Sequence, residues 1–171
     1  MKKRKAPLSG RGLVAARRSR IHGSGVFALR NIRKGQEIVH YLGKLRTHED
    51  VDETYTVAND DGHTFYFTLN DKYVVDAARG GNVARWINHS CRPNCEAVTE
   101  EDPSRDPRKD RILIQAIRDI AAGDELSYDY GILFDGPVTT KEKTLWACRC
   151  GAPNCKGTLL EPRKGGRATA R

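Results

Sequence analysis

Three cysteines near the C-terminal end share one short, turn-rich stretch of the chain: Cys148, Cys150 and Cys155. Glycine and proline between them bend the backbone, and thiolates gathered by such turns are typical ligands of a tetrahedral zinc ion. A fourth ligand must come from elsewhere, and Cys91 and Cys95 are the remaining cysteines. The alternative, free buried thiols, fits poorly with so polar a stretch. The residues therefore favour a zinc site completed by Cys91 or Cys95.

Two short segments of similar sequence could each deliver a tyrosine to a common site. Residues 32–38 and 120–126 both combine a glycine turn with the start of a strand, and the strands lead to Tyr41 and to Tyr128 with Tyr130. The repeat is too short for a solenoid, and such turns also recur by chance. Its meaning depends on how the two segments lie in the fold.

The elements that would position these residues are mostly short strands separated by turns. Apolar runs and alternation predict strands at residues 38–42, 64–69, 73–76, 112–117 and 125–130. One or two helical turns are expected over residues 81–88, where Val83, Trp86 and Ile87 follow a helical spacing. Charges and two prolines predict an exposed hairpin tip at residues 100–110, an improbable place for chemistry. The fold class is mostly β.

The charge of the chain is concentrated at its ends. The 171 residues have a formal net charge of +8, and residues 1–20 hold eight basic groups and no acidic one. Such ends are most simply solvated flexible tails, and secondarily contacts to nucleic acid. No apolar run approaches the roughly 18 residues of a spanning helix, no secretion signal is evident, and an odd number of cysteines argues against a disulfide framework. We expect an intracellular protein without a membrane partner.

Four motifs occur in order along residues 17–160: Arg-Ile-His-Gly-Ser-Gly-Val at residues 20–26, Arg-Trp-Ile-Asn-His-Ser-Cys at residues 85–91, Glu-Leu-Ser-Tyr-Asp-Tyr at residues 125–130, and the C-terminal cysteine cluster. Together they resemble a SET-domain protein-lysine methyltransferase with a post-SET zinc segment. Their order and separation make the resemblance specific. It implies a SET domain at 17–135 and a post-SET zinc segment at 136–161, and the expected basic tails at 1–16 and 162–171 lie outside it.

The resemblance implies a SET fold of small curved β-sheets with a pseudoknot, in which the segment around residues 88–91 passes beneath a loop near Tyr130. It also implies S-adenosylmethionine as methyl donor on one face, and a target lysine entering by a channel from the other. The residues that would bind this cofactor are His22, Gly23, Ser24, Gly25, Val26, Phe65, Arg85, Asn88, His89, Tyr130, Trp146 and Leu159.

The resemblance assigns the catalytic position to Tyr130, the opposing wall of the channel to Tyr41, and to Tyr128 a position where the family has phenylalanine or tyrosine. A tyrosine hydroxyl leaves less room for an already methylated amine, so we expect mono- or dimethylation. The resemblance also implies that Cys91 is the fourth zinc ligand and that Cys95 is not a ligand. The implied ligands are Cys91, Cys148, Cys150 and Cys155, in a structural site.

The expected substrate is a lysine in a basic protein, either a histone, a histone-like bacterial protein or another protein. The expected location is the nucleus in a eukaryote and the cytoplasm in a bacterium. The alternative function is a non-catalytic, zinc-stabilised binding module whose basic tails bind nucleic acid. The intact tyrosines and Asn88 with His89 oppose it, because a pure binding module has no evident use for them.

Overall fold

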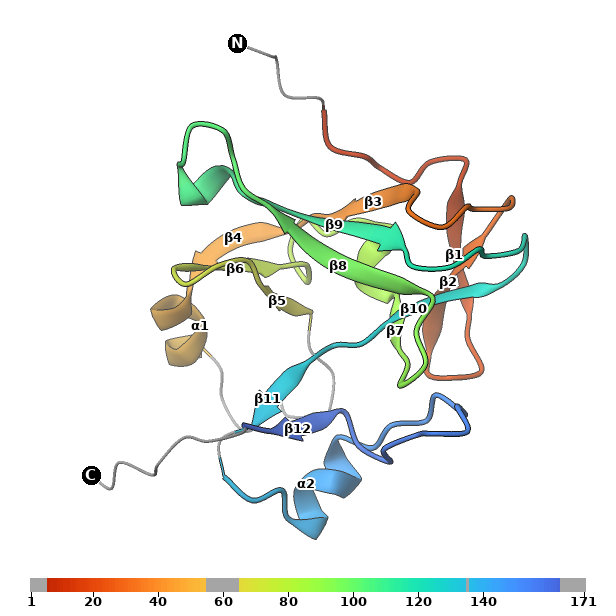
Figure 1. Cartoon of the computed structure of the whole chain (residues 1–171). Coiled ribbons are helices and arrows are strands. Elements are labelled where there is room, and N and C mark those ends of the chain that lie inside the picture. The colour runs from red at the N-terminus through yellow and green to blue at the C-terminus, as the bar shows by residue number, and fades with distance from the viewer. Residues whose placement is uncertain (1–5, 55–64, 135, 164–171) are drawn as a thin grey trace.

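The computed structural model describes residues 6–54, 65–134 and 136–163. Within these ranges the chain is mostly β, and small sheets are arranged around a shared core (Figure 1). The strands, in chain order, are β1 (Val14–Arg18), β2 (Ser24–Ala28), β3 (Glu37–Tyr41), β4 (Lys44–Thr47), β5 (Tyr66–Thr68), β6 (Tyr73–Asp76), β7 (Asn88–His89), β8 (Cys95–Glu100), β9 (Arg111–Ala116), β10 (Glu125–Tyr128), β11 (Ile132–Phe134) and β12 (Leu160–Pro162). The expected mostly β SET fold class is confirmed.

Helices are short, and all but η2 (Val83–Trp86), which packs against the core, lie at the periphery (Figure 1). They are α1 (His48–Thr54), the 3-10 helices η2 and η3 (Pro107–Lys109), and α2 (Thr140–Leu145). The helical turns expected over residues 81–88 are thus a single 3-10 turn, whose Ala84 is buried. No helix in the described ranges has the length and apolar character needed to cross a lipid bilayer.

The strands form four sheets with the orders β1-β2-β10-β7, β3-β9-β8, β4-β6-β5 and β11-β12. The core lies between the first three sheets, where Val26, Val39, Ile114 and Leu126 are fully buried. The parallel pair β11-β12 holds the C-terminal segment beside the body, and α2 precedes that segment (Figure 1). The predicted tip at residues 100–110 does connect the antiparallel strands β8 and β9, although Asp102 within it is buried.

The folded body begins earlier than residue 17, which corrects the expected tail of residues 1–16. β1 starts at Val14, whose side chain is 6% exposed. Further upstream, the Leu8 amide donates to His40 Nδ1 at 2.8 Å, and the His40 amide donates to the Leu8 carbonyl at 2.9 Å. Residues 8–16 are therefore part of the fold. Residues 1–5 and 164–171 of the two predicted tails, like Thr64 of the predicted strand 64–69, lie outside the described residues.

The two similar segments lie against each other and form matching hydrogen bonds. Ile32 and Ile120 exchange both backbone hydrogen bonds at 2.9 Å. The Lys34 amide donates to the Asp119 carboxylate, and in the other copy the Ala122 amide donates to the Asn31 side chain. Gly35 and Gly123 both have positive φ, at 79° and 92°, a conformation that glycine adopts without strain. The two copies therefore form one paired unit from which β3 and β10 both begin.

The short strand β7 is held against β10 with the help of a side chain. Asn88 and His89 pair in parallel with Ser127 and Tyr128. Asn94, which is 3% exposed, continues the pairing: its Oδ1 accepts from the Ser127 amide and its Nδ2 donates to the Glu125 carbonyl, both at 2.8 Å. This pairing brings together residues separated by about a quarter of the chain, and the pockets lie beside it.

Candidate functional site

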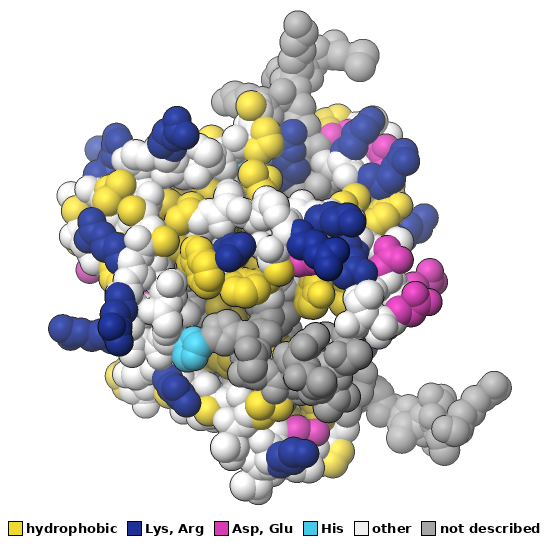
Figure 2. Space-filling model, turned by 180° about the vertical axis from the view of Figure 1, so that it is seen from behind, with side chains coloured by type: hydrophobic (Ala, Val, Ile, Leu, Met, Phe, Trp, Pro, Cys, Tyr) yellow, Lys and Arg dark blue, Asp and Glu magenta, His cyan; other side chains and the backbone are white. Residues whose placement is uncertain are grey.

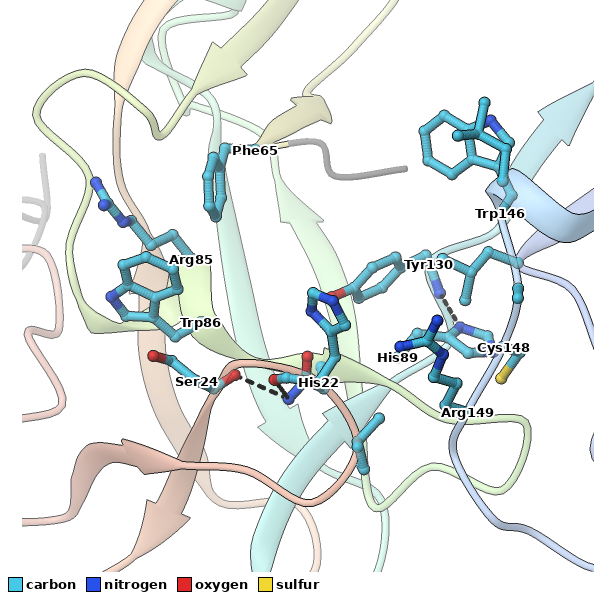
Figure 3. A pocket seen from close by; sticks show the side chains of 15 residues that line it. His22, Ser24, Phe65, Arg85, Trp86, His89, Tyr130, Trp146, Cys148 and Arg149 are labelled. Carbon is cyan, nitrogen blue, oxygen red and sulfur yellow. Dashed lines mark hydrogen bonds between the residues drawn. The ribbon is translucent and has the colours of Figure 1, made fainter. Parts of the chain in front are cut away.

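A pocket opens between the β1–β2 turn, η2, β7 and the C-terminal segment (Figure 3). It brings together nine of the side chains expected to bind a cofactor: His22, Ser24, Phe65, Arg85, Asn88, His89, Tyr130, Trp146 and Leu159. We call it the first pocket. Trp146 and Leu159 reach it from the C-terminal segment, and the Leu159 amide donates to the Trp146 carbonyl at 2.8 Å. The C-terminal segment therefore forms one wall of this pocket.

Asn88 fixes the β1–β2 turn on the floor of the first pocket. Its Nδ2 donates to the Ser24 carbonyl and to Glu125 Oε1, both at 2.9 Å. The same carboxylate accepts from the Ser19 hydroxyl at 2.7 Å. Glu125 thus ties both sides of the turn to β10. Sequence analysis placed Glu125 within a motif without giving it a role, because a strand residue shows no partner in sequence.

His89 and Tyr130 support each other at the centre of the site. The Tyr130 amide donates to His89 Nδ1 at 3.1 Å, and the two rings meet edge to face with centroids 5.4 Å apart. The Tyr130 hydroxyl donates to the Ile87 carbonyl at 2.8 Å. Burial, the largest cause, lowers the pKa of His89. His89 is therefore a neutral, buried ring that sets the position of Tyr130.

Arg85 is held among aromatic rings on the other side of the first pocket. Its guanidinium carbon lies 4.4 Å from the centroid of Trp86 and 5.1 Å from that of Phe65. The two rings contact edge to face at 5.3 Å. Arg85 also donates from Nη1 to the Ala77 carbonyl at 3.2 Å. These contacts place a fixed positive charge at the pocket wall (Figure 3).

A second pocket is lined by the predicted tyrosines of the channel. Tyr41 and Tyr128 lie on its walls together with Phe67, whose ring centroid is 5.2 Å from that of Tyr41 and 5.9 Å from that of Tyr128. The ring of Tyr130 lies 5.0 Å from that of Tyr128. The second pocket is thus a largely aromatic space reached by strands β3, β5 and β10.

The two pockets meet at three shared residues: Arg85, Tyr130 and Trp146. Burial is the largest cause that raises the pKa of each pocket tyrosine, Tyr41, Tyr128 and Tyr130, above its usual value. All three phenols therefore stay protonated in the neutral range and beyond it. Of the three, Tyr130 lines both pockets at their common boundary.

Three residues expected to bind the cofactor do not line either pocket: Gly23, Gly25 and Val26. Val26 is fully buried in the core. At Gly25 a Cβ atom would lie 2.1 Å from Glu125 Oε1, so this position requires glycine for packing against the Glu125 network. Gly23 has a φ of +43° with open space around it, which indicates a turn requirement.

The four expected zinc ligands lie together. The sulfur atoms of Cys91, Cys148, Cys150 and Cys155 are all within 4.8 Å of one another. Those of Cys91 and Cys148 are 3.8 Å apart, which is about the sulfur separation of a tetrahedron with Zn–S bonds of about 2.3 Å. The Lys156 amide points at Cys91 Sγ at 3.4 Å, as a donor to a thiolate would. This donor set fits a structural zinc ion.

Cys95 is separate from this cluster. It is 1% exposed, and burial raises its pKa to about 12. Cys95 is therefore a core thiol, and the geometry selects Cys91 from the two possibilities left open by spacing alone.

Several lining residues of the first pocket were not predicted. Ile21 and Trp86 adjoin predicted residues, while Leu145 and Arg149 adjoin Trp146 and the cysteines. Their position next to motif residues is the sequence signal that could have identified them as pocket residues. Trp86 was instead interpreted as part of an apolar helical face, a pattern that does not separate a core residue from a pocket wall.

Comparison with known proteins agrees with this geometry. The family model described as SET domain matches residues 23–131. The chain is 39% identical over 144 residues to a histone-lysine N-methyltransferase, H3 lysine-4 specific, of Schizosaccharomyces pombe, covering 82% of this chain. It is 39% identical over 161 residues to the protein of the same name in Saccharomyces cerevisiae, covering 93% of this chain, and 35% identical over 148 residues to histone-lysine N-methyltransferase SUV39H2 of Xenopus tropicalis, covering 80%.

The chain is much shorter than these relatives. It spans 14% of the length of each yeast protein and 36% of the Xenopus protein. The family model includes Cys91, Asn88 and Tyr130, whereas the other three cysteines of the cluster lie after its last residue.

Proposed function

Since this chain belongs to the SET-domain family, we propose that it transfers a methyl group from S-adenosylmethionine to the side-chain amine of a lysine in a histone. The observation that supports this most directly is the meeting of the two pockets at Tyr130. The relatives named as histone-lysine N-methyltransferases support the substrate class. Histone substrates place the activity at chromatin, which in a eukaryote lies in the nucleus.

The first pocket is the proposed site of S-adenosylmethionine, which supplies an activated methyl group on a sulfonium. Asn88 and the β1–β2 turn offer fixed polar groups on one side, and Trp146 and Leu159 offer apolar cover on the other. The edge-to-face contact of His89 with Tyr130 fixes the boundary between the pockets. Holding both reactants in a fixed alignment is the main contribution such a site can make.

The second pocket is the proposed lysine channel. A lysine attacks only as the neutral amine, and against a reference pKa near 10.4 its deprotonation at pH 7 costs about 4 to 5 kcal/mol. The aromatic walls formed by Tyr41, Phe67 and Tyr128 disfavour the ammonium form by desolvation. The fixed guanidinium of Arg85, which lines both pockets, acts in the same direction.

The cysteine cluster is the proposed structural zinc site. It joins Cys91, directly after β7, to the C-terminal segment that carries Trp146 and Leu159. Four thiolates leave no open coordination position, so the ion would fold that segment over the first pocket and take no part in the transfer.

The test is transfer of labelled methyl from S-adenosylmethionine to a panel of histones, comparing the wild type with Tyr130→Phe. Loss of the hydroxyl that anchors Tyr130 to the Ile87 carbonyl should lower kcat/KM at least about tenfold. Tyr73→Phe is the matched control, since Tyr73 lines neither pocket. A folded, zinc-loaded wild type that transfers no methyl group would overturn the proposal and favour the non-catalytic module.

A further inference from the structure

The first two strands and their flanking turns carry an unbalanced positive charge. Residues 6–36 contain seven basic residues and no acidic one. All seven are exposed: Arg11, Arg17, Arg18, Arg20, Arg30, Arg33 and Lys34. We call this the β1–β2 basic surface. It belongs to the described fold, in contrast to the five residues that precede it.

The charges of this surface are not neutralised by neighbouring acids. Within the part of the chain that the structure describes, none of the seven forms an ion pair; the basic residues that do so lie on other elements. The nearby carboxylates have other partners: Asp119 accepts from the Lys34 backbone, Asp124 from the Ala121 backbone, and Glu125 from Ser19 and Asn88. Glu37 follows directly in sequence and is exposed. The surface therefore keeps a net positive charge.

β1 presents exposed positive charge at the edge of its sheet. β1 is an edge strand, paired on one side with β2, with Arg17 opposite Gly25 and Arg18 opposite Ser24. Arg17 and Arg18 are the basic residues among its five, and because successive strand residues point to opposite sides of the sheet, they place positive charge on both sides of this edge. In Figure 2, dark blue side chains are spread along the left edge of the molecule with little magenta among them.

We propose that the β1–β2 basic surface binds the phosphate backbone of double-stranded DNA. The choice of duplex over single strand rests on the aromatic residues. Phe27 is the only Phe, Tyr or Trp in residues 6–36, and it is half-buried. Binding of single strands relies on exposed aromatic rings on which bases stack, so this surface offers charge without a stacking platform.

DNA on this surface would leave the proposed lysine channel open. No residue of 6–36 lines the second pocket, whereas Ile21, His22 and Ser24 line the first. The basic surface and the proposed lysine channel are therefore formed by different residues. An enzyme with this arrangement can hold DNA while a basic protein presents its lysine, and DNA binding itself does not depend on methyl transfer.

The test measures binding of the full chain to a fluorescent 20-base-pair DNA duplex by anisotropy between 50 and 200 mM KCl. The surface variant is Arg17→Gln, Arg18→Gln and Arg20→Gln together. Removing three phosphate contacts should weaken binding at 100 mM salt at least about tenfold and reduce the slope of log K against log salt by about 2 to 3. Methyl transfer to a short peptide and bound zinc report that the variant is folded, and neither should change.

The matched control removes three exposed positive charges elsewhere, by Lys72→Gln, Arg108→Gln and Lys109→Gln at the β5–β6 turn and η3. It should bind DNA nearly as the wild type does. A third variant changes only the four basic residues at positions 2–5 to glutamine. Equal losses in the surface and control variants, or a loss confined to the variant at positions 2–5, would overturn the proposal. Tighter binding to a single strand of equal length would also overturn it.

Discussion

Tyr128 and Tyr130 lie two residues apart, and their hydroxyls have different surroundings. The Tyr130 hydroxyl is bound to the Ile87 carbonyl. The Tyr128 hydroxyl forms no hydrogen bond with another described residue, and its side chain lines the second pocket. Tyr130 is therefore held by a hydrogen bond from its hydroxyl, whereas Tyr128 presents its hydroxyl to the space that would hold the target amine.

This difference leads to a prediction about the product. Tyr128→Phe removes an oxygen from the second pocket and makes room for a bulkier, already methylated amine. The wild type should stop mainly at mono- or dimethyl-lysine, and the variant should yield more of the higher methylation states. Mass spectrometry of product peptides measures the distribution. Predominant trimethyl-lysine from the wild type would contradict the prediction.

A second prediction at this scale concerns pH. Burial raises the pKa of Tyr41, Tyr128 and Tyr130 above the usual value near 10, so none of them ionises below pH 10. The rate should therefore rise from pH 7 to 9.5 as the lysine amine loses its proton, without a decline from tyrosine ionisation. Initial rates on a short peptide, with circular dichroism at each pH, measure this. An alkaline decline below pH 10 that Tyr128→Phe abolishes would show that the phenol ionises earlier.

Much of the candidate site could be predicted at the residue scale, because residues that belong to one sequence motif lie close together in the fold. The structure brings nine expected cofactor residues to the first pocket and the four expected cysteines to one cluster. The predicted cofactor contacts of Gly25 and Val26 stay a prediction, while the structure shows that both positions are packed against other parts of the fold. Sequence order alone does not tell which side of a strand faces a pocket when both sides are covered.

At the scale of elements, strands with a clear apolar run were predictable and strands rich in charge or glycine were not. β6 was predicted with its bounds, and β3, β9 and β10 to within two residues. β1, β2 and β4 were missed, because the charged residues of β1 and β4 and the glycine in β2 interrupt the apolar pattern. α1 was missed for a similar reason, since none of its residues is buried.

Asn94 tests how strongly β7 and β10 depend on a side chain. Asn94→Ala leaves the Ser127 amide and the Glu125 carbonyl without their partners in a buried place, which should cost about 2 to 4 kcal/mol of unfolding free energy. Gln115→Ala is the control, because its bond to Glu96 is solvent-exposed and should contribute less than about 1 kcal/mol. Chemical denaturation of zinc-loaded protein measures both. Equal losses would show that Asn94 contributes only an ordinary surface bond.

For the whole molecule, the cysteine cluster links the C-terminal segment to the body. Cys91→Ser should lose stoichiometric zinc and weaken binding of S-adenosylmethionine, since the wall containing Trp146 and Leu159 would no longer be held. Cys95→Ser is the control and should keep its zinc, because Cys95 lies in the core away from the cluster. Metal analysis and calorimetry measure the two effects. Full zinc content in Cys91→Ser would exclude Cys91 as a ligand.

The net charge of +8 does not show how unevenly the charge is distributed along the chain. The charge predicted to lie in flexible tails extends into the fold, because residues 8–16 are part of the body and β1 adds Arg17 and Arg18. The sequence shows where the charges lie along the chain. Only the pairing of β1 with β2 shows that they form an exposed surface on a rigid element.

The paired unit of residues 32–38 and 120–126 is the common starting point of two strands that reach the proposed channel. These strands, β3 and β10, belong to different sheets and end at Tyr41 and Tyr128, which both line the second pocket. The positions of Tyr41 and Tyr128 along their strands are therefore both set relative to the paired residues Ile32 and Ile120. Inserting or deleting one residue in either turn would slide one wall along the other by about 3.3 Å. The channel is therefore far less tolerant of a change in the length of these turns than of a change in their side chains.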